Sequence, residues 1–153
     1  MPNKSLFEKL AANEIPNWKI WEDEEHMAFL TPFPNTPGQT VVAPKKNLGD
    51  DAFELTDVQY QAFLAAAKKA ANLLKKALKV SRVAMVIEGT GVPHVHAKLY
   101  PLHGDLASCT KTAPSHQEFY PEYVGYLTTV EGPKMPDEEL DKMQMKVFSS
   151  LKE

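Results

Sequence analysis

One long amphipathic segment constrains the fold of this chain more than any other feature. It follows Thr56, which is suited to cap the first turn of a helix, with Asp57 beside it in that turn. Apolar residues then recur at i, i+3 and i+4 spacing, which is typical of a helix that buries one stripe. The stripe consists of Tyr60, Phe63, Leu64, Ala67, Ala71, Leu74 and Leu78. Lysines near these positions predict a solvated outer face: Lys68, Lys69, Lys75, Lys76 and Lys79.

Short strand-like runs lie on both sides of this helix. Three precede it, at residues 18–21, 27–30 and 39–43, and two follow it, at residues 82–87 and 94–100. Short loops join most of these runs, so we expect an antiparallel sheet with the helices on one face. The sequence therefore predicts an α+β fold.

Two further helices are predicted near the ends of the chain. Ser5, with Glu8 three residues later, has the spacing of a capping box for a short first helix. Residues 135–140 open a second helix near the C-terminus. We expect a single domain over residues 1–153, with a core at about residues 15–101 and an irregular tail plus the C-terminal helix at residues 102–153.

Charge and composition exclude several classes of partner. The 153 residues include 17 basic and 20 acidic side chains, a net charge of −3, so neither nucleic acid nor an anionic membrane surface is an expected partner. The apolar runs are far shorter than the ~20 residues of a membrane-spanning helix. Cys109 is the single cysteine, and residues 1–14 lack the apolar run of a secretory signal. These features predict a cytoplasmic protein.

The segment between Pro93 and Pro101 carries most of the possible chemistry. Alternate side chains of a strand share one face, so four polar residues are expected to point the same way: His94, His96, Lys98 and Tyr100. A phosphate bound over this face would meet an imidazole and an ammonium group together. A histidine beside a cation is also suited to act as a nucleophile, because a neutral nitrogen is available near pH 7.

Two other interpretations of this face stay open. It can be a solvated strand surface that holds two histidines without a chemical role. It can also be part of a metal site, because His-x-His chelates Zn²⁺ when one or two further ligands are present. The candidates for those ligands follow the strand: His103, Asp105, Cys109 and His116. None of them has a characteristic spacing, so we expect neither a metal nor a cofactor.

Several motifs together resemble the histidine-triad (HIT) family. They are Ile15-Pro16, Glu22-Asp23-Glu24, the stretch at residues 29–46 that reads FLTPFPNTPGQTVVAPKK, and the His-x-His strand. The similarity covers residues 15–101. The tail at residues 125–133 resembles bacterial members named as dinucleoside polyphosphate hydrolases.

The resemblance implies both a fold and an activity. The family fold is a five-stranded antiparallel sheet whose two copies join in a homodimer. Family members bind a purine nucleotide and cleave or transfer at the α-phosphate through a nucleotidyl-histidine intermediate, with no metal required. His96 matches the attacking histidine and His94 matches the residue that orients it. By position, the base and ribose are expected near Ile20, Phe29, Leu30 and Asn35.

The chain departs from the family pattern around the phosphate. Lys98 replaces the third histidine, and Gln39 replaces the histidine that usually follows Pro-Gly. Ile87 stands where the family has a polar residue. Gly91, with Thr90 beside it, stands where the family has Ser or Thr. We therefore hold two hypotheses: an enzyme in which Lys98 and these neighbours bind the phosphate, or a nucleotide-binding protein that has lost turnover.

Overall fold

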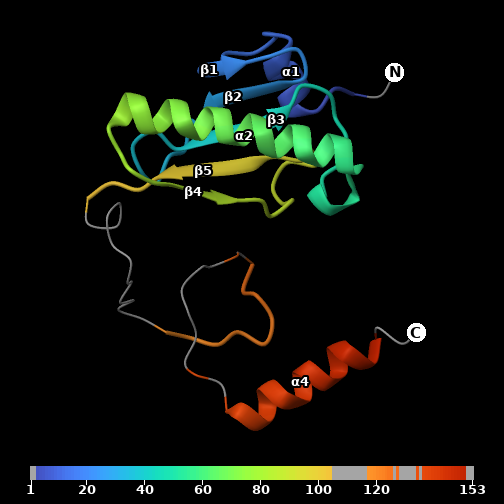
Figure 1. The fold of residues 1–153 in the computed structure, drawn as a ribbon. Helices are drawn as coiled ribbons and strands as arrows, with labels where there is room; N and C mark the ends of the chain where they lie inside the picture. The colour runs from blue at the N-terminus through green and yellow to red at the C-terminus, as the bar shows by residue number, and fades with distance from the viewer. Residues whose placement is uncertain (1–2, 105–116, 126, 128–133, 135, 151–153) are drawn as a thin grey trace. The chain divides into compact units, whose positions relative to one another are not determined.

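A computed structural model describes residues 3–104, 117–125, 127, 134 and 136–150 of the chain. The chain divides into two compact units, Met1–Thr110 and Lys111–Glu153, which are described separately (Figure 1). The first unit contains the sheet and the helices that pack on it. The second contains the helix α4, Asp137–Ser150, so the expected C-terminal helix is present.

The first unit is built on one five-stranded sheet with the order β1-β2-β3-β5-β4. Every neighbouring pair in it is antiparallel. The fold class predicted from the sequence is therefore confirmed. The strands are β1 (Lys19–Glu22), β2 (His26–Leu30), β3 (Thr40–Pro44), β4 (Val83–Val86) and β5 (Ala97–Pro101).

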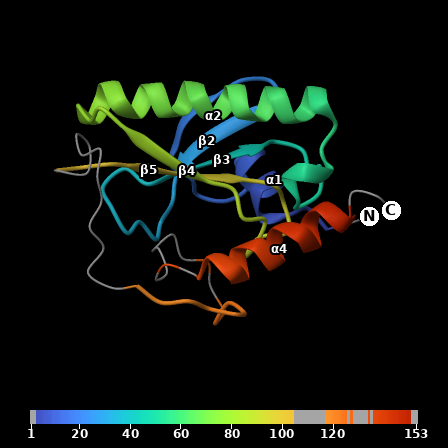
Figure 2. The ribbon, with the colours of Figure 1, turned by 60° about the horizontal axis from the view of Figure 1, so that its bottom comes forward.

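The long helix α2, Asp57–Leu78, covers one face of the sheet (Figure 2). Thr56 caps it as expected, and the Gln59 side chain accepts in return from the Thr56 backbone N–H. The residues that α2 buries are Phe63, Ala66, Ala67, Ala70 and Leu74. They pack on apolar side chains from the central strands, among them Ala28, Val42 and Leu99. The expected stripe is thus correct at its centre, whereas Leu78 at the helix end is exposed.

The short helix α1, Leu6–Ala11, covers the opposite face of the sheet (Figure 2). The expectation that all helices lie on one face is therefore wrong for α1. Met27, Phe29 and Val41 alternate along their strands with the residues that face α2, so they form a second apolar surface. Phe7 and Leu10 of α1 cover this surface, since burial of the apolar area is favourable.

The loop before β3 contains a tight turn at Pro37 and Gly38. Gly38 has φ +82°, and the Gln39 N–H donates to the Thr36 carbonyl at 3.2 Å, as in a type II turn. A Cβ at Gly38 would also crowd the Leu78 side chain, whose exposed end can move aside. Glycine is therefore favoured here mainly by the backbone angle.

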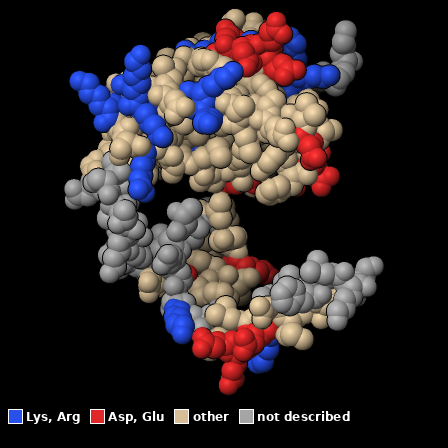
Figure 3. Space-filling view, in the orientation of Figure 1, with Lys and Arg blue, Asp and Glu red and all other residues tan. Residues whose placement is uncertain are grey.

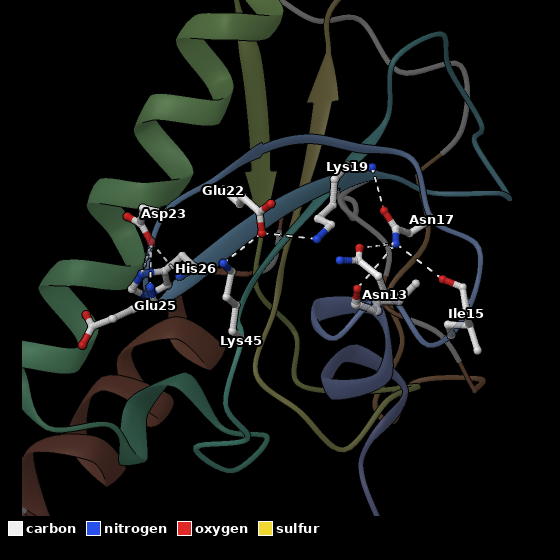
Figure 4. A network of polar contacts seen from close by, with 10 residues as sticks. Asn13, Ile15, Asn17, Lys19, Glu22, Asp23, Glu25, His26 and Lys45 are labelled. Carbon is white, nitrogen blue, oxygen red and sulfur yellow. Dashed lines mark hydrogen bonds and ion pairs between the residues drawn. The ribbon is translucent and has the colours of Figure 1, made fainter.

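Ion pairs and hydrogen bonds fix the corner between β1 and β2 (Figure 4). Glu22 lies between two lysines, with its carboxylate 3.2 Å from Lys19 Nζ and 2.8 Å from Lys45 Nζ. The Asp23 carboxylate accepts from the backbone N–H of His26 at 2.7 Å. Glu22 thus links the edge strand β1 to the end of β3, and Asp23 fixes the first residue of β2.

The outer surfaces of the helices carry the charges that the sequence places there. Figure 3 shows lysines gathered over the C-terminal half of α2, the solvated face that was expected. In the second unit, Leu140 is exposed on α4. The other residues of its expected stripe, at positions 143, 147 and 151, lie outside the described side chains. In the part of the chain that the structure describes, none of the helices has the length and apolar character to cross a membrane.

Candidate functional site

The two motif histidines lie just before β5 and not within it. The expectation of a strand from residue 94 is wrong, because β5 begins at Ala97. The Val95 N–H donates to the Gly49 carbonyl at 2.7 Å, and Gly49 belongs to a loop. The side chains still alternate as expected. Val95 enters the core under α2, whereas His94 and His96 lie on the side of the sheet that α1 covers.

Phe7 of α1 packs against both imidazoles. Its ring meets those of His94 and His96 edge-on, with centroid distances of 5.2 and 5.1 Å. His94 is 0% exposed and His96 is 4% exposed. The histidines are therefore held in a packed environment between α1 and the sheet. Sequence reasoning missed this role of Phe7, since the only signal was its place in a short apolar helix.

Both ring nitrogens of His94 have partners. Nε2 lies 2.7 Å from the carbonyl oxygen of Pro44, which can only accept, so Nε2 carries a proton. Nδ1 lies 2.7 Å from the hydroxyl oxygen of Ser5. Burial lowers the pKa of His94, although the Pro44 carbonyl and the charge of Glu8 act in the opposite direction. The neutral ring then accepts the Ser5 hydroxyl proton at Nδ1, a tautomer assigned from these partners.

His96 presents one nitrogen that is not hydrogen-bonded. Its Nδ1 lies 2.7 Å from the His94 carbonyl oxygen, so Nδ1 carries the proton of the neutral ring. Nε2 makes no hydrogen bond to any residue that the structure describes. Every buried side-chain nitrogen or oxygen in the described part has a partner, so the unbonded Nε2 must reach the surface. His96 therefore offers a lone pair at Nε2 in a fixed orientation.

Lys98 shares the α1 side of the sheet with the histidines, because it pairs across from Val41 in β3. Its ammonium forms an ion pair with the carboxylate of Glu88, and both side chains are partly buried. Sequence reasoning missed Glu88, which directly follows the run at residues 82–87. Lys98 thus carries a counter-ion in this structure, and binding a phosphate would require it to leave or share Glu88.

Two of the expected substrate-binding residues hold the loop before β3. The side-chain oxygen of Gln39 accepts from the Asn35 backbone N–H at 2.8 Å. The Gln39 backbone bonds within the same loop, to Thr31 and Thr36. Gln39 is buried, whereas Asn35 is exposed. Their contacts in the structure are therefore with each other and with the loop.

The remaining expected substrate-binding residues are dispersed. Phe29 is buried on the α1 side, where its ring centroid lies 5.5 Å from that of Phe7. Ile20 packs on the α2 side, because it follows Lys19, which pairs with Phe29, and neighbouring residues of a strand face opposite sides. Leu30 is half-buried at the end of β2, and the exposed Thr90 and Gly91 lie in the connection before His94. The structure thus brings Phe29 to the histidine side and places Ile20 on the other side.

An acidic cavity lies beside Glu88. Its volume is about 370 Å³, and it is lined by Asp50, Asp51, Ala52, Phe53, Ile87, Glu88 and Gly89. Asp51 is engaged in capping a short 3₁₀ turn by accepting from the Phe53 N–H at 2.8 Å. Three carboxylates make the cavity a poor environment for a phosphate. The cavity is therefore not the phosphate position that the motif predicts, which was expected over His94, His96 and Lys98.

In the described part of the chain, the structure does not bring together a set of residues that could bind a metal ion. His103 is exposed, and its Nε2 lies 2.8 Å from the Pro37 carbonyl oxygen. Asp105, Cys109 and His116 lie outside the described residues. Among the residues described, none of the His, Cys, Asp and Glu side chains form a group of three suited to hold a metal ion.

The antiparallel sheet, the long helix and the paired histidines define an α+β domain of HIT type. The HIT domain model matches residues 12–104, more than half of the chain. The chain therefore belongs to the HIT domain family. An uncharacterized HIT-like protein of Mycoplasma genitalium is 37% identical over 102 residues, which make up 63% of this chain and 71% of that protein.

Solved structures show the same fold. SMU.412c from Streptococcus mutans superposes with a TM-score of 0.67 at 26% identity, covering 99% of this chain and 87% of that one. A HIT-like protein of Bartonella henselae, described as involved in cell-cycle regulation and solved with an unknown ligand, superposes with a TM-score of 0.58 at 30% identity. That comparison covers 71% of this chain and 87% of the other.

Proposed function

We propose that this protein binds a purine nucleotide on the α1 side of its sheet and that His96 attacks the α-phosphorus. The observation that carries the proposal is the arrangement of His96, whose Nδ1–H is bonded to the His94 carbonyl while Nε2 stays unbonded. A nucleophilic imidazole needs one neutral nitrogen aimed outward and the other nitrogen fixed. Membership of the HIT domain family supports the same assignment.

The proposed step can be written atom by atom. The Nε2 lone pair forms a bond to the α-phosphorus, and the bond from that phosphorus to the bridging oxygen of the leaving group breaks. The leaving group departs with the bonding electrons, and the His96 ring becomes cationic. The His94 carbonyl, as partner of Nδ1–H, stabilises that cation. Water then attacks the phosphorus, releases a nucleoside monophosphate and a proton, and regenerates the imidazole.

Lys98 is proposed to bind the phosphate during this step. Its ammonium would exchange Glu88 for the phosphoryl oxygens and stabilise their developing charge. At pH 7 a lysine ammonium gives up its proton less readily than a histidine imidazolium does, so the absence of a third histidine favours substrates with good leaving groups. Dinucleoside polyphosphates, whose leaving group is a nucleoside polyphosphate, are the class that fits best.

A second candidate function is nucleotide binding without turnover. The Lys98–Glu88 ion pair and the loop contacts of Gln39 favour it, because they engage the groups expected to contact a phosphate. On this alternative the histidines only shape the binding surface. The two candidates differ in one observable, the chemical conversion of a bound nucleotide.

The test compares His96→Ala with the wild-type protein and with His103→Ala. His103 is a matched control, since it is an exposed histidine bonded to a loop carbonyl. Hydrolysis of a dinucleoside polyphosphate should fall at least about a thousandfold in His96→Ala and stay unchanged in His103→Ala. Thermal shift should show that all three proteins still bind the nucleotide. Binding by the wild-type protein without any hydrolysis would support the second candidate.

A homodimer is proposed on separate grounds. β4 is an edge strand of the sheet, and its Met85 side chain is 47% exposed. An uncovered edge strand can pair with another strand. A two-fold axis beside β4 would pair the β4 strands of two copies, so that each covers the edge of the other. We expect light scattering at micromolar concentration to give about twice the chain mass of 17.1 kDa. The chain mass itself would contradict the dimer.

A further inference from the structure

The described part of the chain contains two capping boxes, and of these the one at α1 has a contact beyond its own helix. In α1 the Ser5 hydroxyl accepts from the Glu8 N–H at 3.1 Å, and in α2 the Thr56 hydroxyl accepts from the Gln59 N–H at 3.3 Å. The Ser5 hydroxyl also lies 2.7 Å from His94 Nδ1, far along the sequence. The described contacts of the Thr56 hydroxyl stay within α2.

The proton of the Ser5 hydroxyl is directed to His94. Because the hydroxyl oxygen already accepts from the Glu8 N–H, its own proton is free to donate. His94 Nε2 donates to the Pro44 carbonyl, so Nδ1 of the neutral ring can only accept. The hydrogen bonds therefore run in one direction, from the first turn of α1 through His94 to the end of β3.

A second set of contacts holds this first turn in place. The Glu8 carboxylate accepts from the Ser5 N–H at 2.8 Å and from the Asn47 N–H at 3.2 Å. The Asn47 side-chain amide donates to the carbonyl of Pro93, the residue before His94, at 3.2 Å. The N–H bonds from Ser5 and then from Asn47 lower the pKa of Glu8. The carboxylate thus stays ionised and, through Asn47, joins α1 to the segment just before His94.

We propose that Ser5 is a positioning residue for the nucleotidyl transfer assigned to His96. By donating to Nδ1, Ser5 fixes the ring of His94, and the His94 carbonyl in turn fixes Nδ1 of His96. This inference rests on the proposed function. Its first part, the fixed ring of His94, does not depend on any activity and can be measured in the resting protein.

The variants separate positioning from helix capping. Ser5→Ala removes both the cap and the donor, and Ser5→Thr restores both. Thr56→Ala is the matched control, because it removes the other capping hydroxyl at a distance from the histidines in the chain. Nitrogen NMR of the histidine side chains reports which ring nitrogen of each histidine carries the proton and whether Nδ1 accepts a hydrogen bond. Rapid acid quench with a dinucleoside polyphosphate, labelled at the α-phosphate, gives the rate of nucleotidyl-histidine formation.

The expected results are specific to Ser5. In the wild-type protein, His94 is protonated at Nε2 with a hydrogen-bonded Nδ1, and His96 is protonated at Nδ1. Ser5→Ala shifts the Nδ1 resonance of His94 and slows nucleotidyl-histidine formation about tenfold, with nucleotide affinity within about twofold. Ser5→Thr, which keeps a hydroxyl at this position, shows neither effect, and Thr56→Ala also shows neither.

Three results would overturn the inference. These are a wild-type His94 protonated at Nδ1, a Ser5→Ala protein with an unchanged His94 resonance, and a Thr56→Ala protein slowed as much as Ser5→Ala. If Ser5→Ala does not fold, the wild-type spectrum and the Ser5→Thr variant still test whether Ser5 fixes the ring of His94. If the wild-type protein forms no nucleotidyl-histidine, the proposed function fails. The NMR results then still accept or reject the role of Ser5 in fixing His94.

Discussion

The two faces of the sheet are covered by helices, but they bury different kinds of group. The α2 face is an apolar cluster around Phe63, Ala67 and Leu74, and the buried His26 stacks on Phe63 with ring centroids 6.5 Å apart. The α1 face combines an apolar cluster around Phe7 and Phe29 with two buried imidazoles. One face therefore depends mainly on packing, and the other also depends on completed hydrogen bonds.

On the proposed function, this difference places stability and chemistry on opposite faces. Burial on the α2 side stabilises the fold through removal of apolar area from water. Burial of His94 and His96 on the α1 side would be costly without partners, and the Ser5 hydroxyl and the carbonyls of Pro44 and His94 supply them. Substitutions on the two faces should therefore have separable effects on unfolding and on ligand chemistry.

The largest expected change in stability comes from the α2 face. Phe63→Ala removes a fully buried ring and should lower the free energy of unfolding by about 3–5 kcal/mol. Nucleotide affinity of the folded protein should not change, since Phe63 lies on the side of the sheet away from the histidines. Denaturant unfolding and calorimetric titration measure the two quantities. Val58→Ala, at an exposed position of α2, is the control. A loss of affinity in folded Phe63→Ala would show that the faces are coupled.

A smaller change, in affinity, is expected at Lys98. Lys98→Ala should weaken binding of a nucleoside monophosphate by about 1.5–3 kcal/mol and leave binding of the matching nucleoside almost unchanged. Glu88→Gln should strengthen binding of the monophosphate, because the ammonium would lose its competing carboxylate. If neither substitution alters the affinity for the monophosphate, Lys98 has only its structural ion pair.

The smallest expected effect is a pH dependence of stability that arises on the α1 face. Burial holds the pKa of His94 below its ordinary value of 6.5 in the folded protein. Below about pH 6.5, His94 therefore binds a proton more readily in the unfolded chain than in the folded protein. The free energy of unfolding falls as the pH decreases through this range. The pKa of Glu8 is lowered from 4.5, so its protonation reduces the free energy of unfolding only at lower pH. Unfolding measured from about pH 7.5 to about pH 5 isolates the contribution of His94. His94→Asn should reduce this dependence, and an equal dependence in that variant would contradict the assignment.

Periodicity predicted the elements of the fold because local rules decide them. The capping box at Ser5 and the N-cap at Thr56 were predicted correctly from spacing alone. The side of the sheet that α1 covers was not, because a six-residue helix contains no local information about which apolar face it meets. The start of β5 was misplaced for a similar reason, since the partner of Val95 is a loop carbonyl distant in the sequence.

The sequence predicted which residues form the motif of the candidate site, but it did not predict the residues that contact them. Alternation correctly put His94, His96 and Lys98 on one side of the chain. The contacts that determine the state of His94 come from residues remote in sequence, namely Ser5 and the carbonyl of Pro44. Glu88 is nearer, but its bond to Lys98 depends on the pairing of β4 with β5. Spacing along one strand contains none of this information.

The central claim is that Nε2 of His96 forms a covalent bond to the α-phosphorus of a nucleotide. The most direct measurement is acid quench of the wild-type protein during turnover of a dinucleoside polyphosphate, followed by mass spectrometry of its peptides. The account predicts one nucleotidyl group per modified chain, located on His96 and absent from His96→Ala. A nucleotidyl group on His94 or Lys98, or hydrolysis without any adduct, would contradict it.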